Sequence, residues 1–263
     1  MSIWKKIFGK KQQAKVGQTE ESLDQRYSKL IDSLEKFKRR AYIPSIQEVE
    51  PQHNSNSKIG GLPFLRFKDD WPICPSCKTR MQFFMQLDLS KLPLRASSGL
   101  VQLFYCTNED PFCGDELESY LPFSKASVCR RIDIDVSSYR GDHDLTKVYN
   151  EKQFVGWTTK DDYPDYEEWG SLGINQDIDD DVFDLMDERG EGVALEGDKL
   201  FGWPHWVQSV EYPYDRQSGK QMDLLFQLDS MVNLPYMFGD AGIGHITVSA
   251  DNPDELGFGW ACS

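Results

Sequence analysis

The sequence predicts an α+β protein that is mainly β, in which an N-terminal amphipathic helix precedes an internally duplicated, two-repeat β-rich domain. Three observations carry this prediction. From about residue 58 onward, short apolar runs alternate with Gly, Pro, Asn and Asp; two stretches of the chain match at an offset of 141 residues; and a helical pattern precedes both. Because the chain has neither a run of about 18 apolar residues nor the apolar region of a signal peptide, we expect no transmembrane segment and a cytoplasmic protein.

Residues 1–17 are predicted to form a basic, flexible leader. Within residues 2–15, Trp4, Ile7 and Phe8 are spaced so that one helical turn would bring them together, with lysines around them. This pattern allows a weak contact with a membrane surface. The alternative is a basic leader that only aids solubility.

Residues 18–57 are predicted to hold the N-terminal helix and a linker. Apolar residues recur there at the i, i+3, i+4 and i+7 positions, which is typical of an amphipathic helix. Acidic residues come early and basic residues late, which suits the helix dipole, and Pro44 is expected to end the helix. The apolar positions are Leu23, Tyr27, Leu30, Ile31, Leu34 and Phe37.

The two repeats are assigned to residues 58–140 and 199–263. Each contains a Gly-x-Pro turn, a hairpin arm, a Gln-Leu-Asp strand, a Leu-Pro loop and a closing strand. The matching segments are 58–63 with 199–204 and 81–88 with 222–229, and the later elements follow after a slip of one or two residues. Four matches in the same order indicate a tandem duplication.

Gln86 and Gln227 occupy the same place in the two repeats, each inside an apolar strand. A side-chain amide in such a place must find partners for up to four hydrogen bonds. Either it clamps the backbone of the neighbouring Gly-Pro loop, or it faces a ligand in a groove between the halves.

The cysteines of the first repeat have the pattern of a structural zinc site. Cys74 and Cys77 form a CxxC pair, and Cys106 and Cys113 follow as a looser pair. Four thiolates around one Zn²⁺ form a closed tetrahedral site with no open position for catalysis. We therefore expect a hairpin held by structural zinc. A redox CxxC, which requires a helix after its first cysteine, is the alternative.

The second repeat has Asp215 and Ser218 at the positions that correspond to Cys74 and Cys77, so no second metal site is expected there. Cys129 and Cys262 lie outside any metal-binding pattern and are interpreted as small buried apolar residues.

The repeat and the cysteines together resemble the YwqG-like family of bacterial proteins and, through it, the eukaryotic programmed cell death protein 2 family. The resemblance covers residues 58–263. It rests on GGLP at 60–63, CPSCKTRMQFFMQLDL at 74–89, the cysteine-bearing stretch 104–113, and the second GWP and MDLLFQLD copy. It implies a duplicated β-rich domain that binds protein or peptide. The eukaryotic members are chaperones dedicated to a small-subunit ribosomal protein, and the family has no established enzymatic activity.

No catalytic motif is evident, so we expect a non-enzymatic protein. The four histidines, His53, His143, His205 and His245, lie in none of the common metalloprotease or hydrolase motifs. His245 alternates with apolar residues and is expected to face solvent or the opposite face of its sheet. An enzyme of unknown reaction, with its site between the repeats, remains the alternative.

Charge is distributed unevenly along the chain. Residues 1–60 carry a net charge of +5 and residues 61–263 a net charge of -19. Segment 141–198 is predicted to be an acidic connection between the repeats, and 15 acidic residues and one basic residue lie in 161–198. This balance argues against binding to nucleic acid and favours a basic protein or peptide as the partner.

The predicted function is therefore chaperone-like recognition of a basic partner. An immunity-type inhibitor of a toxin is an alternative, and a solvated acidic surface without a partner is another interpretation of the charge. Aromatic residues near the acidic segment would supply apolar anchors. The candidate partner-binding residues are Gln86, Gln227, Trp157, Tyr163, Tyr166, Trp169, Trp203 and His205.

Overall fold

The computed structural model of the protein describes residues 21–65, 71–94, 98–134, 148–175 and 178–263. The expected leader, its membrane-contacting residues 2–15 and His143 lie outside these ranges. The described helices are α1 (Leu23–Glu35), α2 (Cys113–Glu116), α3 (Tyr166–Leu172) and α4 (Asp180–Arg189), with a short 3-10 turn, η3, at Leu89–Lys91. The strands are β1 (Arg39–Val49), β2 (Lys58–Ile59), β3 (Gln82–Asp88), β4 (Leu100–Tyr105), β5 (Ser127–Ile132), β6 (Glu151–Asp162), β7 (Lys199–Phe201), β8 (Asp223–Asp229), β9 (Ile243–Val248) and β10 (Leu256–Ala261).

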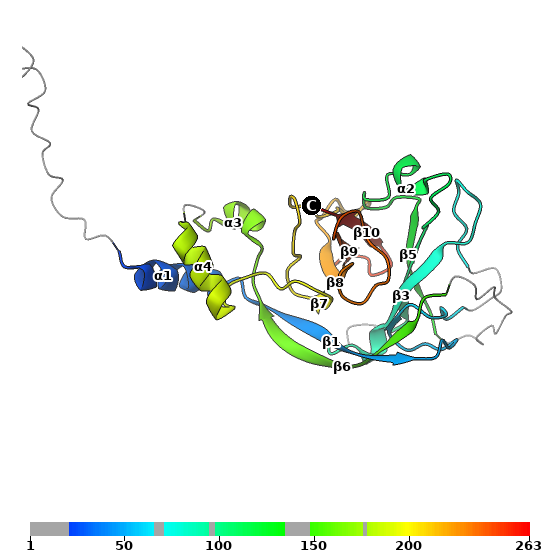
Figure 1. The fold of residues 1–263 in the computed structure, drawn as a ribbon, viewed down its shortest axis with the longest axis horizontal. Coiled ribbons are helices and arrows are strands. Elements are labelled where there is room, and N and C mark those ends of the chain that lie inside the picture. Colours follow the sequence, from blue (N-terminus) through cyan, green and yellow to red (C-terminus); the bar gives the residue numbers. More distant parts are fainter. Residues whose placement is uncertain (1–20, 66–70, 95–97, 135–147, 176–177) are drawn as a thin grey trace, which may run out of the picture.

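The ten strands form one antiparallel sheet in the order β10-β9-β8-β7-β1-β6-β2-β3-β4-β5 (Figure 1). The sheet curls until its two edges approach each other, so it is nearly closed and barrel-like. Trp260 on β10 donates from its backbone N–H to the carbonyl of Tyr120 and from its indole to the hydroxyl of Tyr105, both at 3.1 Å. The protein is thus mainly β, as the sequence predicts.

A long antiparallel pair of strands, β1 and β6, forms the middle of the sheet and joins its two halves (Figure 1). On the β1 side of this pair, the sheet continues in space with β7, β8, β9 and β10, which we call the second half. On the β6 side it continues with β2, β3, β4 and β5, the first half. In the first half, Lys58 on β2 pairs with Gln86 on β3; in the second, Lys199 on β7 pairs with Gln227 on β8. The paired residues of the second half therefore lie 141 residues after those of the first, which is the offset between the matching sequence segments.

Helix α1 begins at a capping box, in which the Ser22 side chain accepts from the N–H of Gln25 and the Gln25 side chain accepts from the N–H of Ser22. The helix ends at Glu35, earlier than expected, because the residues from Arg39 onward pair with β6 instead. Pro44 lies inside β1 and does not end the helix. Strand β7 pairs with β1 only at Ala41 and Tyr42, so Pro44 lies beyond that pairing and the sheet tolerates its missing N–H.

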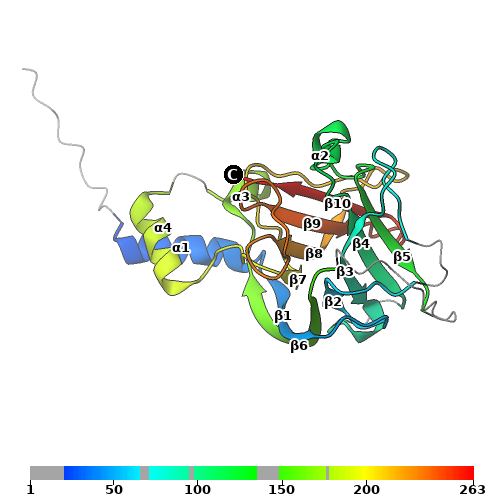
Figure 2. The same cartoon turned by 45° about the vertical axis from the view of Figure 1, so that its right-hand side comes forward.

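The expected linker and the expected acidic connection are thus partly strand. Residues 39–49 and 151–162 form the central strand pair, β1 and β6, and α3 and α4 follow β6. Together with α1, these two helices form a helical lobe at one end of the molecule, away from β2 to β5 (Figures 1 and 2). Its core contains Tyr27, Leu30, Leu34, Tyr163, Trp169, Ile174, Val182 and Met186.

The main core lies inside the curved sheet and is shared by both halves. Phe84 and Tyr105 from the first half contact Phe238 from the second, with ring centroids 5.9 and 5.7 Å apart. Burial of large aromatic rings dominates the energy of such a core, so the two halves stabilise each other. Among the described helices, none is both long and apolar enough to cross a membrane.

Candidate metal centre

The first pair of cysteines lies on a tight turn that precedes β3. The backbone N–H of Cys74 donates to the carbonyl of Thr79 at 2.9 Å, and the N–H of Lys78 donates to the carbonyl of Cys74 at 3.1 Å. Lys78 adopts a φ of 60°, the left-handed conformation that lets the chain reverse directly after Cys77. The turn therefore directs both sulfurs to the same side.

The second pair comes from the end of β4 and the start of α2. Cys106 follows the last residue of β4, and its N–H donates to the carbonyl of Ala126 at 2.8 Å. Cys113 opens α2, and its N–H donates to the carbonyl of Asn108 at 3.3 Å. The loop between these cysteines is stabilised by the Asn108 side chain, which donates to the carbonyl of Pro111 at 2.8 Å.

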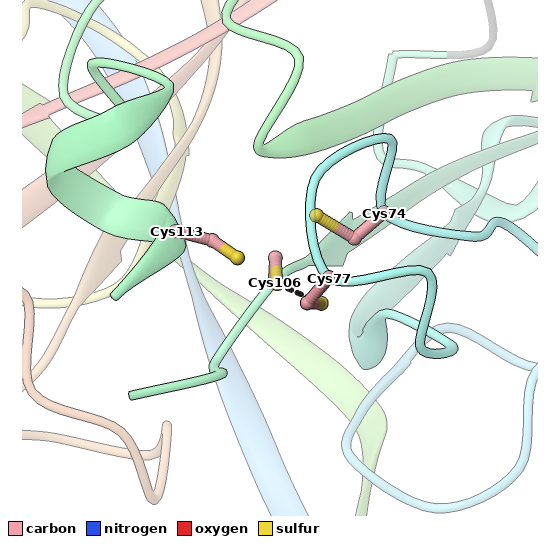
Figure 3. Close-up of side chains that lie close together, drawn as sticks. All are labelled: Cys74, Cys77, Cys106 and Cys113. Carbon is pink, nitrogen blue, oxygen red and sulfur yellow. Dashed lines mark hydrogen bonds between the residues drawn. The ribbon is translucent and has the colours of Figure 1, made fainter. Parts of the chain in front are cut away.

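The four cysteine sulfurs converge on one point (Figure 3). Their Sγ atoms all lie within 4.8 Å of one another, and those of Cys77 and Cys106 are 3.7 Å apart. A tetrahedral zinc with Zn–S bonds of about 2.3 Å requires sulfurs about 3.8 Å apart. All four cysteines are free thiols in the structure. The geometry is thus compatible with a metal site.

The cluster is enclosed by apolar side chains. Cys74, Cys106 and Cys113 are buried, whereas Cys77 is partly exposed. The surrounding residues are Leu65, Met81, Phe83 and Phe104, with Trp71, Leu117 and Val128 at the edge. Water is largely excluded from such a site, which strengthens the attraction between thiolates and a cation.

Burial disfavours the ionised form of the thiols, and a bound cation would favour that form. Burial raises the pKa of Cys106 and of Cys113. Burial also opposes ionisation of Cys77, but hydrogen bonds from Thr79 and then from the neighbouring thiols lower its pKa to about 6. One thiolate is therefore favoured, and the positive charge of a metal ion would stabilise the others.

The corresponding turn of the second half is stabilised by hydrogen bonds instead. Asp215 stands in place of Cys74, and its N–H again donates to a carbonyl five residues on, that of Lys220, at 2.8 Å. Its carboxylate accepts from the N–H groups of Gln217 and Ser218 at 2.8 and 2.6 Å. A hydrogen bond with Ser249, followed by these backbone bonds, lowers the pKa of Asp215 to about 2. One carboxylate thus closes this turn without cysteine.

Gln86, a predicted partner-binding residue, is fully buried and clamps two loops of the first half. Its Oε1 accepts from the N–H of Phe64 at 2.9 Å, and its Nε2 donates to the carbonyls of Asn54 and Asn56 at 2.8 Å. With all its groups bonded to backbone, Gln86 has no surface for a partner. The loop-clamping interpretation is therefore the one that the structure supports.

Gln227 makes the same contacts in the second half. Its Oε1 accepts from the N–H of His205 at 2.8 Å, and its Nε2 donates to the carbonyls of Leu195 and Gly197 at 3.2 and 2.9 Å. It is also fully buried. The loop-clamping interpretation is therefore the one that the contacts of Gln227 support as well.

Three of the predicted aromatic anchors are buried in the helical lobe or at its contact with the sheet. Tyr163 donates to the carboxylate of Glu35 at 2.6 Å, and the indole of Trp203 donates to the carbonyl of Phe37 at 2.8 Å. The indole of Trp169 donates to a backbone carbonyl within the lobe at 2.9 Å. These side chains are core residues, because their rings are buried and their polar atoms already make hydrogen bonds within the protein.

The remaining predicted anchors are more accessible. Tyr166 on α3 is 41% exposed. Trp157 on β6 is half-buried and packs edge-on against Phe154, with ring centroids 5.4 Å apart. His205 is half-buried, and its Nδ1 lies 3.2 Å from a carboxylate oxygen of Asp165. Tyr166 is therefore the one predicted anchor with a large exposed ring.

The sequence reasoning missed two buried ion pairs at the junction of the halves. Lys58 contacts Glu151 at 2.9 Å and Lys199 contacts Asp162 at 3.0 Å, and all four side chains are fully buried. The two lysines could have been noticed in the sequence, because each is the first residue of the matching segments 58–63 and 199–204. Their acidic partners lie on β6, outside the repeats, so no sequence pattern connects them.

His245 does not face solvent, which was the first of its two expected positions, because it is only 7% exposed. Its ring packs against Trp206 with centroids 4.9 Å apart. Burial, and then the nearby charges of Lys199 and His205, lower the pKa of His245 to about 3. The ring is therefore neutral at physiological pH.

Comparisons with known proteins place the chain in a family. No curated protein matches it. A family model described as a domain of unknown function, DUF1963, matches residues 57–261, which include the cysteine cluster and nine of the ten strands. With more than three quarters of its length in that match, the chain belongs to the DUF1963 family.

Proposed function

We propose that the protein is a non-enzymatic, chaperone-like protein of the cytoplasm that binds a basic protein or peptide. The observation that supports this most directly is the acidic surface of the helical lobe. Six acidic side chains of α4 and its N-cap are exposed: Asp179, Asp180, Asp181, Asp184, Asp187 and Glu188. A surface of one charge sign attracts partners of the opposite sign and speeds their encounter.

Few of these charges are neutralised within the protein. Among the described residues, Asp179 alone of the six is in an ion pair, with Arg26 at 2.8 Å. The one basic residue of α4, Arg189, instead contacts Asp24 at 3.2 Å. The surface therefore keeps most of its negative charge for a partner.

An exposed aromatic ring adjoins this acidic surface. The ring of Tyr166 lies 5.4 Å from that of Phe183 on α4 and 5.2 Å from that of Trp169, which fixes its orientation. A rigid aromatic side chain at the edge of a charged surface is a suitable apolar anchor for a peptide.

We also propose that Cys74, Cys77, Cys106 and Cys113 bind a structural zinc ion and that the two halves of the sheet are tandem repeats. The convergence of the sulfurs supports the first proposal. The equivalent hydrogen bonds of Gln86 and Gln227 support the second. Membership in DUF1963, a domain that YwqG-like proteins carry, is in keeping with the resemblance to that family and to the programmed cell death protein 2 family.

Fluorescence anisotropy with a labelled Lys/Arg-rich peptide tests the proposed function. The test variant carries Asp184→Asn, Asp187→Asn and Glu188→Gln, which lie toward the C-terminal end of α4, where negative charge does not stabilise the helix. We expect binding that weakens with salt and falls about tenfold in this variant.

The matched control carries Glu109→Gln, Asp133→Asn and Asp240→Asn, three exposed acidic residues outside the lobe. We expect this control to bind like the unmodified protein. Equal losses in both variants would refute a specific role for the lobe, and the absence of any peptide binding at low salt would refute the proposed basic partner.

A further inference from the structure

The outer hairpins of the two halves close with the same backbone bond but carry loops of very different length. In the first half the N–H of Cys106 donates to the carbonyl of Ala126 at 2.8 Å, and in the second half the N–H of Ser249 donates to the carbonyl of Glu255 at 3.0 Å. Residues 107–125 fill the first loop, which is much longer than the second. Because the short loop is enough to pair β9 with β10, the extra length of the first loop is not needed for strand pairing.

The first part of the long loop is held at the cysteine cluster. Cys113 opens α2 and points toward the other three cysteines (Figure 3). This helix has four residues and no side-chain cap at its N-terminus, so it has little stability of its own. Leu117 packs at the edge of the cluster, and the Ser76 side chain, from the CxxC turn, donates to the carboxylate of Glu116. These contacts of α2 with the hairpin all lie at or beside the cluster.

The later part of the loop, residues 117–124, covers the outer edge of β10, and we call it the strap. The carbonyl of Tyr120 accepts from the backbone N–H of Trp260 at 3.1 Å, and the hydroxyl of Ser119 accepts from that of Tyr105 at 2.7 Å. Strand β10 is the last in the sheet, so no further strand pairs with this edge. The strap therefore supplies an acceptor that a neighbouring strand would otherwise supply.

The strap is coupled to α2 and does not hold its own shape. The backbone N–H of Ser119 donates to the carbonyl of Gly114 on α2 at 2.8 Å. Within the strap, Glu118 and Phe123 have φ angles of 48° and 63°, the left-handed conformation that residues other than glycine adopt at a cost. Such a backbone persists only while its surroundings hold it. The position of the strap therefore depends on its contacts with both α2 and β10.

We propose that a metal ion bound by the four cysteines holds the strap on β10, and that loss of the metal frees the strap and opens the outer edge of this strand. The metal fixes Cys113 relative to the other three cysteines, and α2 passes this constraint to the strap. Open strand edges pair with other chains, so the metal decides whether this edge is available. The inference rests on the proposed zinc site.

The test is amide hydrogen exchange of the full-length ¹⁵N-labelled protein, followed by NMR with zinc bound and after a chelator has removed it under reducing conditions. The N–H of Trp260 reports on the strap directly, because its acceptor is the carbonyl of Tyr120. We expect this amide to exchange about tenfold faster without zinc. The N–H of Trp203, which donates to the buried carboxylate of Asp162 at 2.8 Å, is the internal control and should keep its rate.

Three variants separate the metal from the strap. Cys113→Ser removes the one cysteine on α2 and should speed exchange at Trp260, whereas Cys129→Ser changes a cysteine outside the cluster and should not. Ser119→Ala removes a contact of the strap and not of the metal. It should keep its zinc and speed exchange at Trp260 by about two- to tenfold.

Two results would overturn the inference. An unchanged exchange rate at Trp260 after zinc removal would show that the strap stays in place without the metal. Equal acceleration at Trp260 and Trp203 would show that the metal stabilises the whole fold and not the strap in particular.

Elemental analysis of the same samples separates the inference from the proposed zinc site. If the protein neither contains zinc nor takes it up, the zinc site is wrong and the inference is wrong with it. If the protein holds zinc but its removal does not affect Trp260, the zinc site stands and the inference alone is wrong.

Discussion

Replacement of Lys199 by methionine tests the importance of the buried ion pair at the junction of the two halves. The ammonium of Lys199 donates to Asp162 at 3.0 Å and to the carbonyl of Leu195 at 2.6 Å, with no exposed surface. Asp162 also accepts from the N–H groups of Leu195 and Trp203, both at 2.8 Å. Methionine has a similar length but leaves this carboxylate without its cation.

The expected cost follows from that uncompensated charge. Removing one partner of a buried ion pair costs about 3–5 kcal/mol of stability. Burial lowers the pKa of Lys199 although Asp162 opposes the shift, so the pair does not fully offset its own desolvation. The backbone donors to Asp162, which are the N–H groups of Leu195, Trp203 and Tyr163, also remain in the variant. We therefore expect the lower end of the range, about 3 kcal/mol.

The assay is urea unfolding followed by tryptophan fluorescence, with the free energy of unfolding extrapolated to water. Lys220→Met is the control, because it removes an exposed lysine that contacts Asp251 at 2.8 Å, and it should not change stability measurably. Adding Asp162→Asn to Lys199→Met should recover part of the loss by removing the buried charge. A loss below about 1 kcal/mol in Lys199→Met would refute the reasoning.

Three further predictions concern the zinc, the buried histidine and the loop clamps. Purified protein should contain about one zinc per chain by elemental analysis. Cys77→Ser should lose the metal and several kcal/mol of stability, whereas Cys129→Ser should keep the zinc. Retention of zinc by Cys77→Ser would contradict the assignment. The folded-state pKa of His245, about 3, lies below its unfolded value of about 6.5. Between these two pH values the unfolded chain binds a proton at His245 that the folded protein does not bind. The free energy of unfolding therefore falls as the pH drops from about 6.5 towards 3. His245→Gln, which installs the residue found at this place in the first half, should reduce that pH dependence by up to about 1.4 kcal/mol per pH unit, as measured by unfolding between pH 6.5 and 4; identical pH profiles would show that His245 is not the titrating group. Gln227→Leu should cost about 1–3 kcal/mol for each backbone group it leaves unpaired, read from thermal unfolding, and a neutral effect would mean that water replaces the amide.

The features that could be predicted from the sequence are those carried by local or repeated patterns. The four cysteines were recognisable as candidate metal ligands because thiolates suit zinc and because each of the two pairs is close along the chain, and the structure brings all four sulfurs together. The loop-clamping interpretation of Gln86 could be stated because an amide in an apolar strand requires partners, although its actual partners, Asn54 and Asn56, could not be named.

The features that escaped prediction depend on contacts distant in sequence. Strand β1 was assigned to a helix end and a linker because its partner, β6, lies about a hundred residues later. Pro44 was interpreted as a helix stop for the same reason. Exposure to solvent was left as one of two positions for His245 because strand alternation does not reveal that Trp206 packs against the ring. Likewise, the exposed or buried state of Tyr166 and Trp169 depends on how α3 packs against α4, which their sequence neighbours do not specify.

The central position of β1 has a consequence for where the protein can be cut. The family match begins at residue 57, after β1 has ended, yet β1 lies between β7 and β6 in the middle of the sheet. A fragment with the boundaries of the match would expose the backbone groups of both neighbouring strands, and open strand edges promote aggregation. The smallest piece that can complete the sheet therefore starts no later than Arg39, before the sequence that defines the family.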